Sequence, residues 1–251
     1  MPILHLSDIV AISWFLSSWI VYSLVIENTA KGRSSLNALM NHYRDDWMEQ
    51  LLAREMRMVD AQVTAALQNG TAFFASTSII AIGGTLTLLR ATDQILTVIG
   101  LLPFSVSTSP ETWELEVVGL AVIFVYAFFK FAWSYRLFNY FAIMVGAAPP
   151  PAEKDTPAAQ AYAHRAARLC ADAGRHFNRG QRAFFFALGY LGWFLGPLEL
   201  GLTTTDVVIV MWRRAVLVGI AQGVRDGEAL GHSIRTAIVA TVSTAMPIAS
   251  V

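Results

Sequence analysis

Four long apolar segments, separated by more polar connections, dominate the pattern of this sequence. They cover residues 9–26, 71–89, 117–141 and 183–212. A helix needs about 20 apolar residues to cross the hydrocarbon of a bilayer, where unpaired backbone groups find no partner. The pattern therefore predicts an all-α, polytopic membrane protein with four transmembrane helices.

The last apolar segment is the longest and is interrupted by Gly196 and Pro197. We expect a single kinked span over 183–212, since proline and glycine commonly kink a helix. A re-entrant hairpin broken at Pro197 is the alternative. Residues 213–251 form a C-terminal tail, and the pattern leaves open which side of the membrane it occupies.

The two long connections, residues 30–70 and 147–182, have helical patterns of their own. In the first, apolar residues recur at steps of three and four: Leu36, Met40, Tyr43, Trp47 and Leu51. The second opens with a proline-rich linker, 147–151, before helix-forming residues resume at Ala158. Such spacing is typical of helices with one buried face, so we expect a helical layer beside the membrane.

Basic residues concentrate in these same two connections, whereas the connection 90–116 holds one arginine against several acids. Because cytoplasmic loops are enriched in Lys and Arg, both long connections are predicted to be cytoplasmic and the N-terminus outside. The setting would be a bacterial inner membrane. The composition agrees, with 55% hydrophobic and 14% charged residues. The formal net charge of zero gives no indication of a nucleic-acid partner.

A stripe of arginines is the sharpest polar pattern in the chain. These arginines share one face of the predicted helix in the second connection: Arg165, Arg168, Arg175, Arg179 and Arg182. The first connection carries an excess of acids: Asp45, Asp46, Glu49, Glu55 and Asp60. The stripe is expected to pair with these acids, to bind anionic lipid headgroups, or to bind another anionic ligand.

Two charges fall inside the predicted spans, where a charge is a functional candidate by default. Lys130 lies within reach of the cytoplasmic interface, with Tyr126 and Trp133 one turn away, so we expect an interfacial anchor. Glu199, beside Pro197, is expected to be a solvated carboxylate near the outer face. The alternative is that the two charges line a transport path.

Small residues on the second predicted span indicate a helix-packing seam. They are Ala72, Ser76, Gly83 and Thr87, and small residues let membrane helices approach closely. No metal, cofactor or catalytic constellation is predicted. His42, Asp45, Asp46 and Glu49 share a helical face and could ligate a divalent metal, but no second cluster completes a metal shell.

Several segments together resemble the membrane proteins grouped as domain-of-unknown-function family 599. They are Arg44 with Trp47-Met48, then Arg54, Arg57 and Val59-Asp60-Ala61, then Phe73 to Thr77, Gly83-Gly84, Phe129-Lys130-Phe131, Trp133, Arg136, Asn139-Tyr140, Gly146 to Pro149, Trp193-Phe194, Pro197 and Arg213-Arg214. The resemblance covers roughly residues 30–215 and ends at Ala215-Val216-Leu217. It implies a multi-span membrane protein and no established activity.

We expect an interaction protein, either a homo-oligomer or an accessory subunit of a membrane complex. Its partners would be the lipid bilayer, including anionic lipids, and other membrane subunits or a second copy. The alternative is an oligomeric channel or small transporter, with Ser76, Thr77, Lys130 and Glu199 near its path. An enzyme is disfavoured, because no motif assembles a nucleophile, a base and an orienting group.

Overall fold

The computed structural model describes residues 4–28, 36–99 and 109–213, and every regular element in these ranges is helical. The helices are α1 (Leu6–Asn28), α3 (Leu36–Ala53), α4 (Met58–Arg90), α5 (Thr92–Ile99), α6 (Pro110–Gly146) and α7 (Pro157–Tyr190). Two short 3-10 helices, η1 (Pro151–Glu153) and η2 (Leu191–Phe194), flank α7, and residues 197–213 form a further helix. The prediction of an all-α chain is confirmed.

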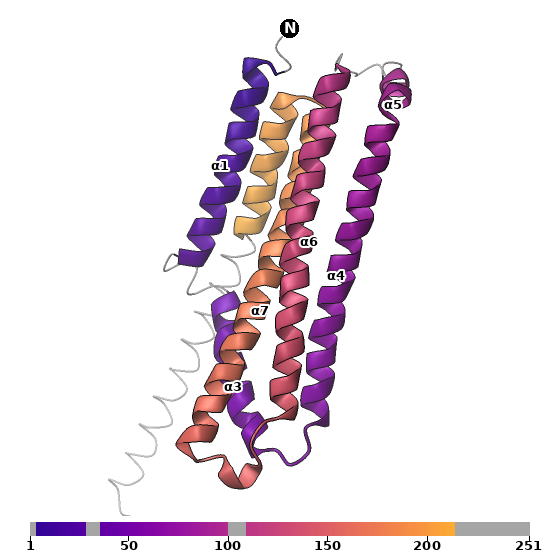
Figure 1. Cartoon of the computed structure of the whole chain (residues 1–251). Helices are drawn as coiled ribbons and strands as arrows, with labels where there is room; N and C mark the ends of the chain where they lie inside the picture. The colour runs from indigo at the N-terminus through magenta and orange to yellow at the C-terminus, as the bar shows by residue number, and fades with distance from the viewer. Residues whose placement is uncertain (1–3, 29–35, 100–108, 214–251) are drawn as a thin grey trace, which may run out of the picture.

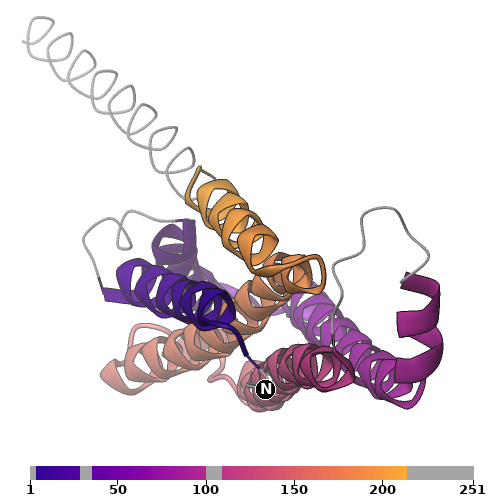
Figure 2. The same cartoon turned by 90° about the horizontal axis from the view of Figure 1, so that it is seen from above.

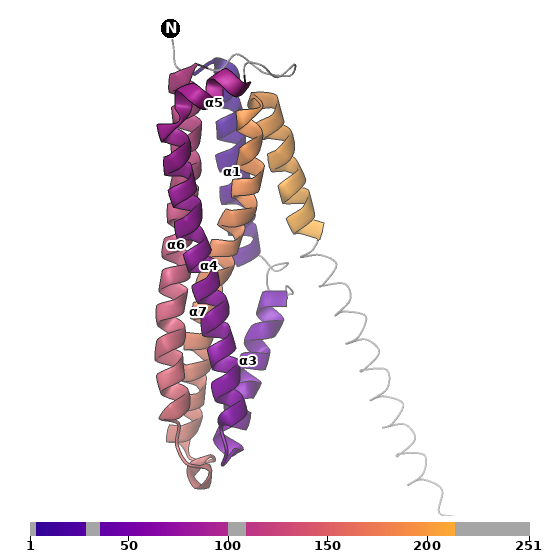
Figure 3. The same cartoon turned by 90° about the vertical axis from the view of Figure 1, so that its right-hand side faces the viewer.

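Three long helices run the length of the molecule, with α6 between α4 and α7 (Figure 1). They have 33, 37 and 34 residues, hence about 50 Å each, well beyond the ~30 Å of a bilayer core. In one half, called here the apolar half, α1 and the helix 197–213 flank α7 (Figure 2). In the other half, called the stem, α3 packs against α7 (Figure 3).

Side-chain caps begin two of the long helices. Ser109 Oγ accepts a hydrogen bond from the Thr112 N–H at 3.3 Å before α6. Thr156 Oγ1 accepts one from the Ala159 N–H at 3.2 Å before α7. A proline follows each cap, where its missing N–H costs nothing and its fixed φ suits a first helical turn. Both helices thus begin where the sequence places a cap and a proline.

The fourth predicted span is not one kinked helix but a helical hairpin. After η2 the chain reverses at Gly196, whose φ of +148° is rarely adopted by other residues. The helix 197–213 then runs back along the end of α7 (Figure 3). Thr203 Oγ1 donates to the Gly189 carbonyl at 2.6 Å across the hairpin. Glycine and proline therefore turn the chain here rather than bend a single helix.

Three of the described helices are long and apolar enough to cross a membrane: Leu6–Glu27, Met58–Arg90 and Pro110–Gly146. They coincide with the first three predicted spans. The hairpin divides the fourth apolar segment into shorter helical pieces, so this segment is not among the candidate membrane-spanning helices. The arrangement is that of a multi-pass membrane protein.

Each half has its own core. In the apolar half, Phe15, Phe131 and Phe186 are at most 2% exposed and lie among further rings of α1, α4 and α7. We call this the aromatic core. In the stem, α7 buries a row of small residues against α3 and α6: Ala159, Ala163, Ala166, Ala167, Cys170 and Ala173. We call this the alanine core.

Candidate functional site

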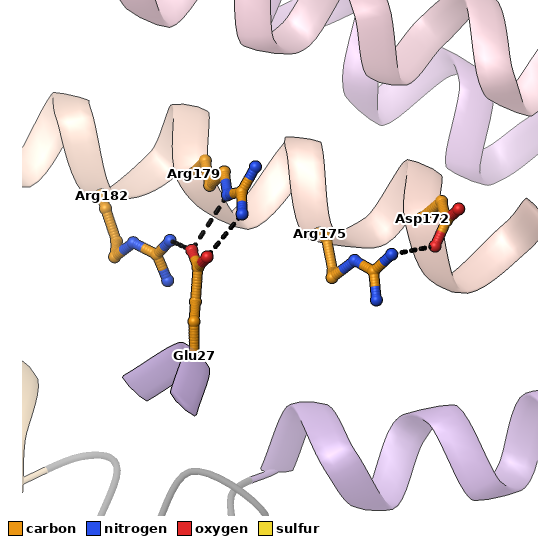
Figure 4. A network of polar contacts seen from close by, with 5 residues as sticks. All are labelled: Glu27, Asp172, Arg175, Arg179 and Arg182. Atoms are coloured by element: carbon orange, nitrogen blue, oxygen red, sulfur yellow. Dashed lines mark hydrogen bonds and ion pairs between the residues drawn. The ribbon is translucent and has the colours of Figure 1, made fainter. Parts of the chain in front are cut away.

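The basic stripe of α7 reaches across to the end of α1. Arg179 Nε donates to Glu27 Oε1 at 2.9 Å, and Arg182 also pairs with this carboxylate (Figure 4). The Arg182 side chain is 10% exposed and that of Glu27 29%. A carboxylate held by two guanidinium groups gives strong, directional hydrogen bonds. This network fixes the last turn of α1 on α7, where the apolar half meets the stem.

The remaining stripe arginines lie elsewhere. Arg175 pairs with Asp172, one turn back on its own helix (Figure 4). The guanidinium of Arg165 lies 5.9 Å from the centre of the Tyr162 ring. Arg168 is exposed. Pairing of this stripe with the acids of the first connection does not occur among the described residues, because α7 turns its alanine face to α3 and the arginines lie about half a turn around the helix.

The acids of the first connection do not form one cluster but have different partners. Asp60 is fully buried and accepts hydrogen bonds from Trp47 Nε1 at 2.7 Å and from Arg54 at 2.6 Å, which ties α3 to α4. Asp45 lies 3.7 Å from His164 of α7, and Asp46 lies 3.9 Å from His42. Glu49 and Glu55 are exposed. Of this group, Asp45 alone contacts α7 through an ion pair in the described structure.

Lys130 and Glu199 form no ion pair with each other in the described structure. Lys130 Nζ lies 5.0 Å from the centre of the Tyr126 ring, one helical turn away. This contact fits an interfacial anchor. Glu199 is half-buried just after the turn at Gly196, on a different helix. Arg136, rather than Lys130, covers Trp133, at 5.6 Å.

The predicted seam of α4 does not pack within the protomer. The face that α4 buries carries hydroxyls at seven-residue intervals: Thr64, Thr71, Ser78 and Thr85. Each of these hydroxyls donates to a carbonyl of its own helix at 2.7–2.8 Å, so its burial leaves no donor unpaired. Ser76, Gly83 and Thr87 are exposed instead, and Ala72 is half-buried.

Sequence reasoning missed two buried acids at the end of the apolar half that lies away from the stem. Asp8 of α1 is 7% exposed and Glu116 of α6 is 4% exposed. Trp193 Nε1 donates to Asp8 Oδ1 at 3.2 Å. Glu116 Oε2 has no hydrogen-bond partner among the described residues. Glu116 lies three residues after Trp113 and four before Leu120, which places all three on the buried face of α6. This spacing was the sequence signal that could have indicated its burial.

Two titratable groups of the stem are held neutral. Burial raises the pKa of the Cys170 thiol to about 11, although Arg44 opposes this shift. Burial, followed by the nearby charges of Lys130 and Arg179, lowers the pKa of His176 below its ordinary value. A thiol with a raised pKa is a poor nucleophile, so Cys170 is a packing residue of the alanine core.

The family model described as a protein of unknown function, DUF599, matches residues 10–218. The chain belongs to this family. The DUF599 match extends from α1 through the hairpin and thus includes the Glu27 network, the buried acids other than Asp8, and both cores. No curated protein and no solved structure matches the chain. DUF599 membership therefore establishes the family and leaves the activity to be inferred from the site.

Proposed function

We propose that this protein is an interaction protein of the bacterial inner membrane, which self-associates through the outer face of α4. Its N-terminus would lie outside and its stem in the cytoplasm. The distribution of Lys and Arg supports this orientation, since the connections that form the stem carry most of the basic residues. The stem would then stand free for contacts in the cytoplasm.

The exposed small residues of α4 carry this proposal. Ser76, Gly83 and Thr87 are exposed, and the space around the Cβ positions of Gly83 and Gly84 is open to 4 Å. Lipid tails can cover large aliphatic side chains, such as those on the outer face of α1, without any partner protein. A face of glycine, serine and threonine instead lets a second helix approach closely and form dispersion contacts and cross-helix hydrogen bonds.

A second copy of the chain is the partner that we propose for this face. A stripe of small residues along one helix is complementary to itself about a two-fold axis, and two-fold symmetric dimers are the commonest oligomers. An accessory role on a different membrane protein would use the same face of α4. The two possibilities differ in the mass of the cross-linked product.

Disulfide cross-linking in native membranes tests the contact. In a Cys170→Ala background, Ser76→Cys and Gly83→Cys are expected to form dimers of twice the mass of the chain on mild oxidation. Ile20→Cys is the matched control, because Ile20 is 58% exposed on the outer face of α1. Equal cross-linking at all three positions indicates random collision and rejects the proposal. A product of another mass assigns the face to a different protein.

Transport is the second candidate, and the buried acids favour it. Ionisable residues inside membrane helices are costly and commonly mark ion or proton pathways. Asp8 and Glu116 lie on different helices and are both more than nine-tenths buried. Lys130 and Glu199, the charges expected near a path, are half-buried and lie on different helices.

Proton flux into proteoliposomes separates the two functions. A transporter predicts a flux that Glu116→Gln abolishes and that Glu114→Gln leaves intact. Absence of any flux above that of empty liposomes removes the transport candidate and leaves the interaction function.

A further inference from the structure

A half-enclosed cavity opens between α3, α4, α6 and α7 at the level where the stem meets the apolar half. Its volume is about 290 Å³. Apolar side chains form most of its wall, including Leu67, Phe138 and Phe177. On α4 the cavity reaches Gly70 and Thr71, where the apolar run of that helix begins.

Among the described residues that line the cavity, Arg44 alone is charged. Its Nη1 donates to Asn41 Oδ1 at 2.5 Å. A guanidinium has five N–H donors, and the hydrogen bond to Asn41 uses one of them. None of the described residues that line the cavity carries a carboxylate.

A glycine of α7 holds this guanidinium in place. A Cβ added at Gly174 would lie 2.8 Å from Arg44 Nη2 and 3.2 Å from Cζ. The guanidinium therefore lies close to the backbone of α7, and any larger residue at position 174 would displace it. The side chain is positioned toward the cavity by packing as well as by its hydrogen bond.

We propose that this cavity binds the phosphate headgroup of an anionic phospholipid through Arg44. An arginine is suited to phosphate, because its planar fork of donors matches two phosphate oxygens. The apolar wall fits the glycerol and first methylene groups of the same lipid. A tail that leaves the cavity along α4 meets exposed apolar residues such as Phe73, which is 65% exposed.

This site is distinct from the arginine stripe of α7, in which Arg179 and Arg182 are already occupied by Glu27. It is also distinct from the proposed contact face of α4, because Gly70 lies on another side of that helix than Ser76 and Gly83. The cavity therefore gives the protein a preference for lipid composition that self-association alone does not supply.

Native mass spectrometry of the delipidated full chain, titrated with dioleoylphosphatidylglycerol, tests the proposal. We expect one tightly bound lipid, with an apparent Kd about tenfold weaker in Arg44→Gln, which is the size expected for a lost charge-assisted hydrogen bond. Arg165→Gln is the matched control, because Arg165 is an exposed arginine of the same stem. Equal weakening by the two substitutions indicates diffuse surface attraction and overturns the site.

A second variant tests the cavity without removing its charge. The space around Gly70 is open to 4 Å, so Gly70→Leu fits the fold and fills part of the cavity. We expect the lipid to bind about tenfold more weakly, while Gly146→Leu, also at an open position, leaves binding unchanged. Unaltered binding by Gly70→Leu overturns the proposal, including in the case where Arg44→Gln does not fold.

The source of the phosphate is decided by two further probes. Dioleoylphosphatidylcholine is expected to bind at least tenfold more weakly than the anionic lipid, since its headgroup has no net charge. Inorganic phosphate is expected not to displace the lipid at equal concentration. Equal binding of phosphatidylcholine rejects the electrostatic basis, and displacement by inorganic phosphate assigns the cavity to a soluble anion.

Discussion

The helices α6 and α7 contribute to both the aromatic core and the alanine core, but α7 presents large rings to the first and small side chains to the second. In the aromatic core, Phe186 of α7 contacts the rings of Phe15, Trp19 and Tyr22, and its stacking on Trp19 has a centroid distance of 5.2 Å. In the alanine core, α7 contributes mainly methyl groups, and the larger side chains come from α3 and α6: Met48, Leu51, Leu52, Phe138 and Phe141. The change occurs near Gly180 and Ala183, within one continuous helix.

The difference shows where each half obtains its stability. Lipid tails are as apolar as the helices, so the apolar half gains little from removing surface from water and depends on dispersion between well-fitted rings. We infer that the stem lies in water, where burial of Met48 and Leu52, each at most 2% exposed, is itself favourable. Small residues on α7 then allow α3 to approach closely.

The largest expected effect comes from removing a ring of the aromatic core. Phe186→Ala should lower the free energy of unfolding by about 3 kcal/mol or more, because the neighbouring rings cannot collapse into the space. Leu188→Ala, at a 60% exposed position of the same helix, should change it by less than about 0.5 kcal/mol. Reversible unfolding in bicelles measures both, and similar losses would contradict the ring-based account of this half.

An intermediate effect is expected from enlarging a methyl group of the alanine core. Ala163→Leu should destabilise the protein by about 2 kcal/mol, since Ala163 is 2% exposed and faces α3. The loss should appear as faster proteolysis between α3 and α4, at residues 54–57, because α3 is the element displaced. Ala161→Leu is the control, at an exposed position on α7. Protection of that segment in Ala163→Leu would show that the core is loosely packed.

The smallest effect concerns the ionisation of Cys170. Its folded pKa, about 11, is above the ordinary value of 9.0, so the neutral thiol is favoured by folding. The resulting stability is present below about pH 9 and is lost as the pH rises toward 11. Between pH 8 and pH 10 the free energy of unfolding should fall by about 1 kcal/mol more than in Cys170→Ala. Equal slopes for the two proteins would mean that the thiol is solvated.

The helical class, the first three apolar helices and the family could be predicted from sequence, because runs of about 20 apolar residues have few structural solutions. At Gly196 the single kinked span was preferred and a hairpin was the alternative, and the structure has the hairpin. Glycine followed by proline occurs in both, and only the φ of +148° at Gly196 decides between them. The sequence correctly located the break in the helix at Gly196 and Pro197. Whether the chain kinks or reverses there depended on how residues 197–213 pack on α7.

The candidate site was less predictable, because residue type did not reveal which face of a helix is buried. On α4 the small residues were predicted to form a helix-packing seam, whereas the positions buried within the protomer are Thr64, Thr71, Ser78 and Thr85. Their hydroxyls donate to carbonyls of α4 itself, so these polar residues can be buried without a partner on another helix. Residue type alone does not indicate this. Glu27 was overlooked for a similar reason, since a carboxylate at the end of a span is ordinarily solvated rather than held by two arginines.

The continuity of α6 and α7 couples the two halves mechanically. Neither helix is interrupted where the cores meet, and there the ring of Phe131 rests against Gly180, at which an added Cβ would lie 2.6 Å from it. Because α6 and α7 are continuous over about 50 Å, a tilt of the stem about this contact would displace the far ends of both helices.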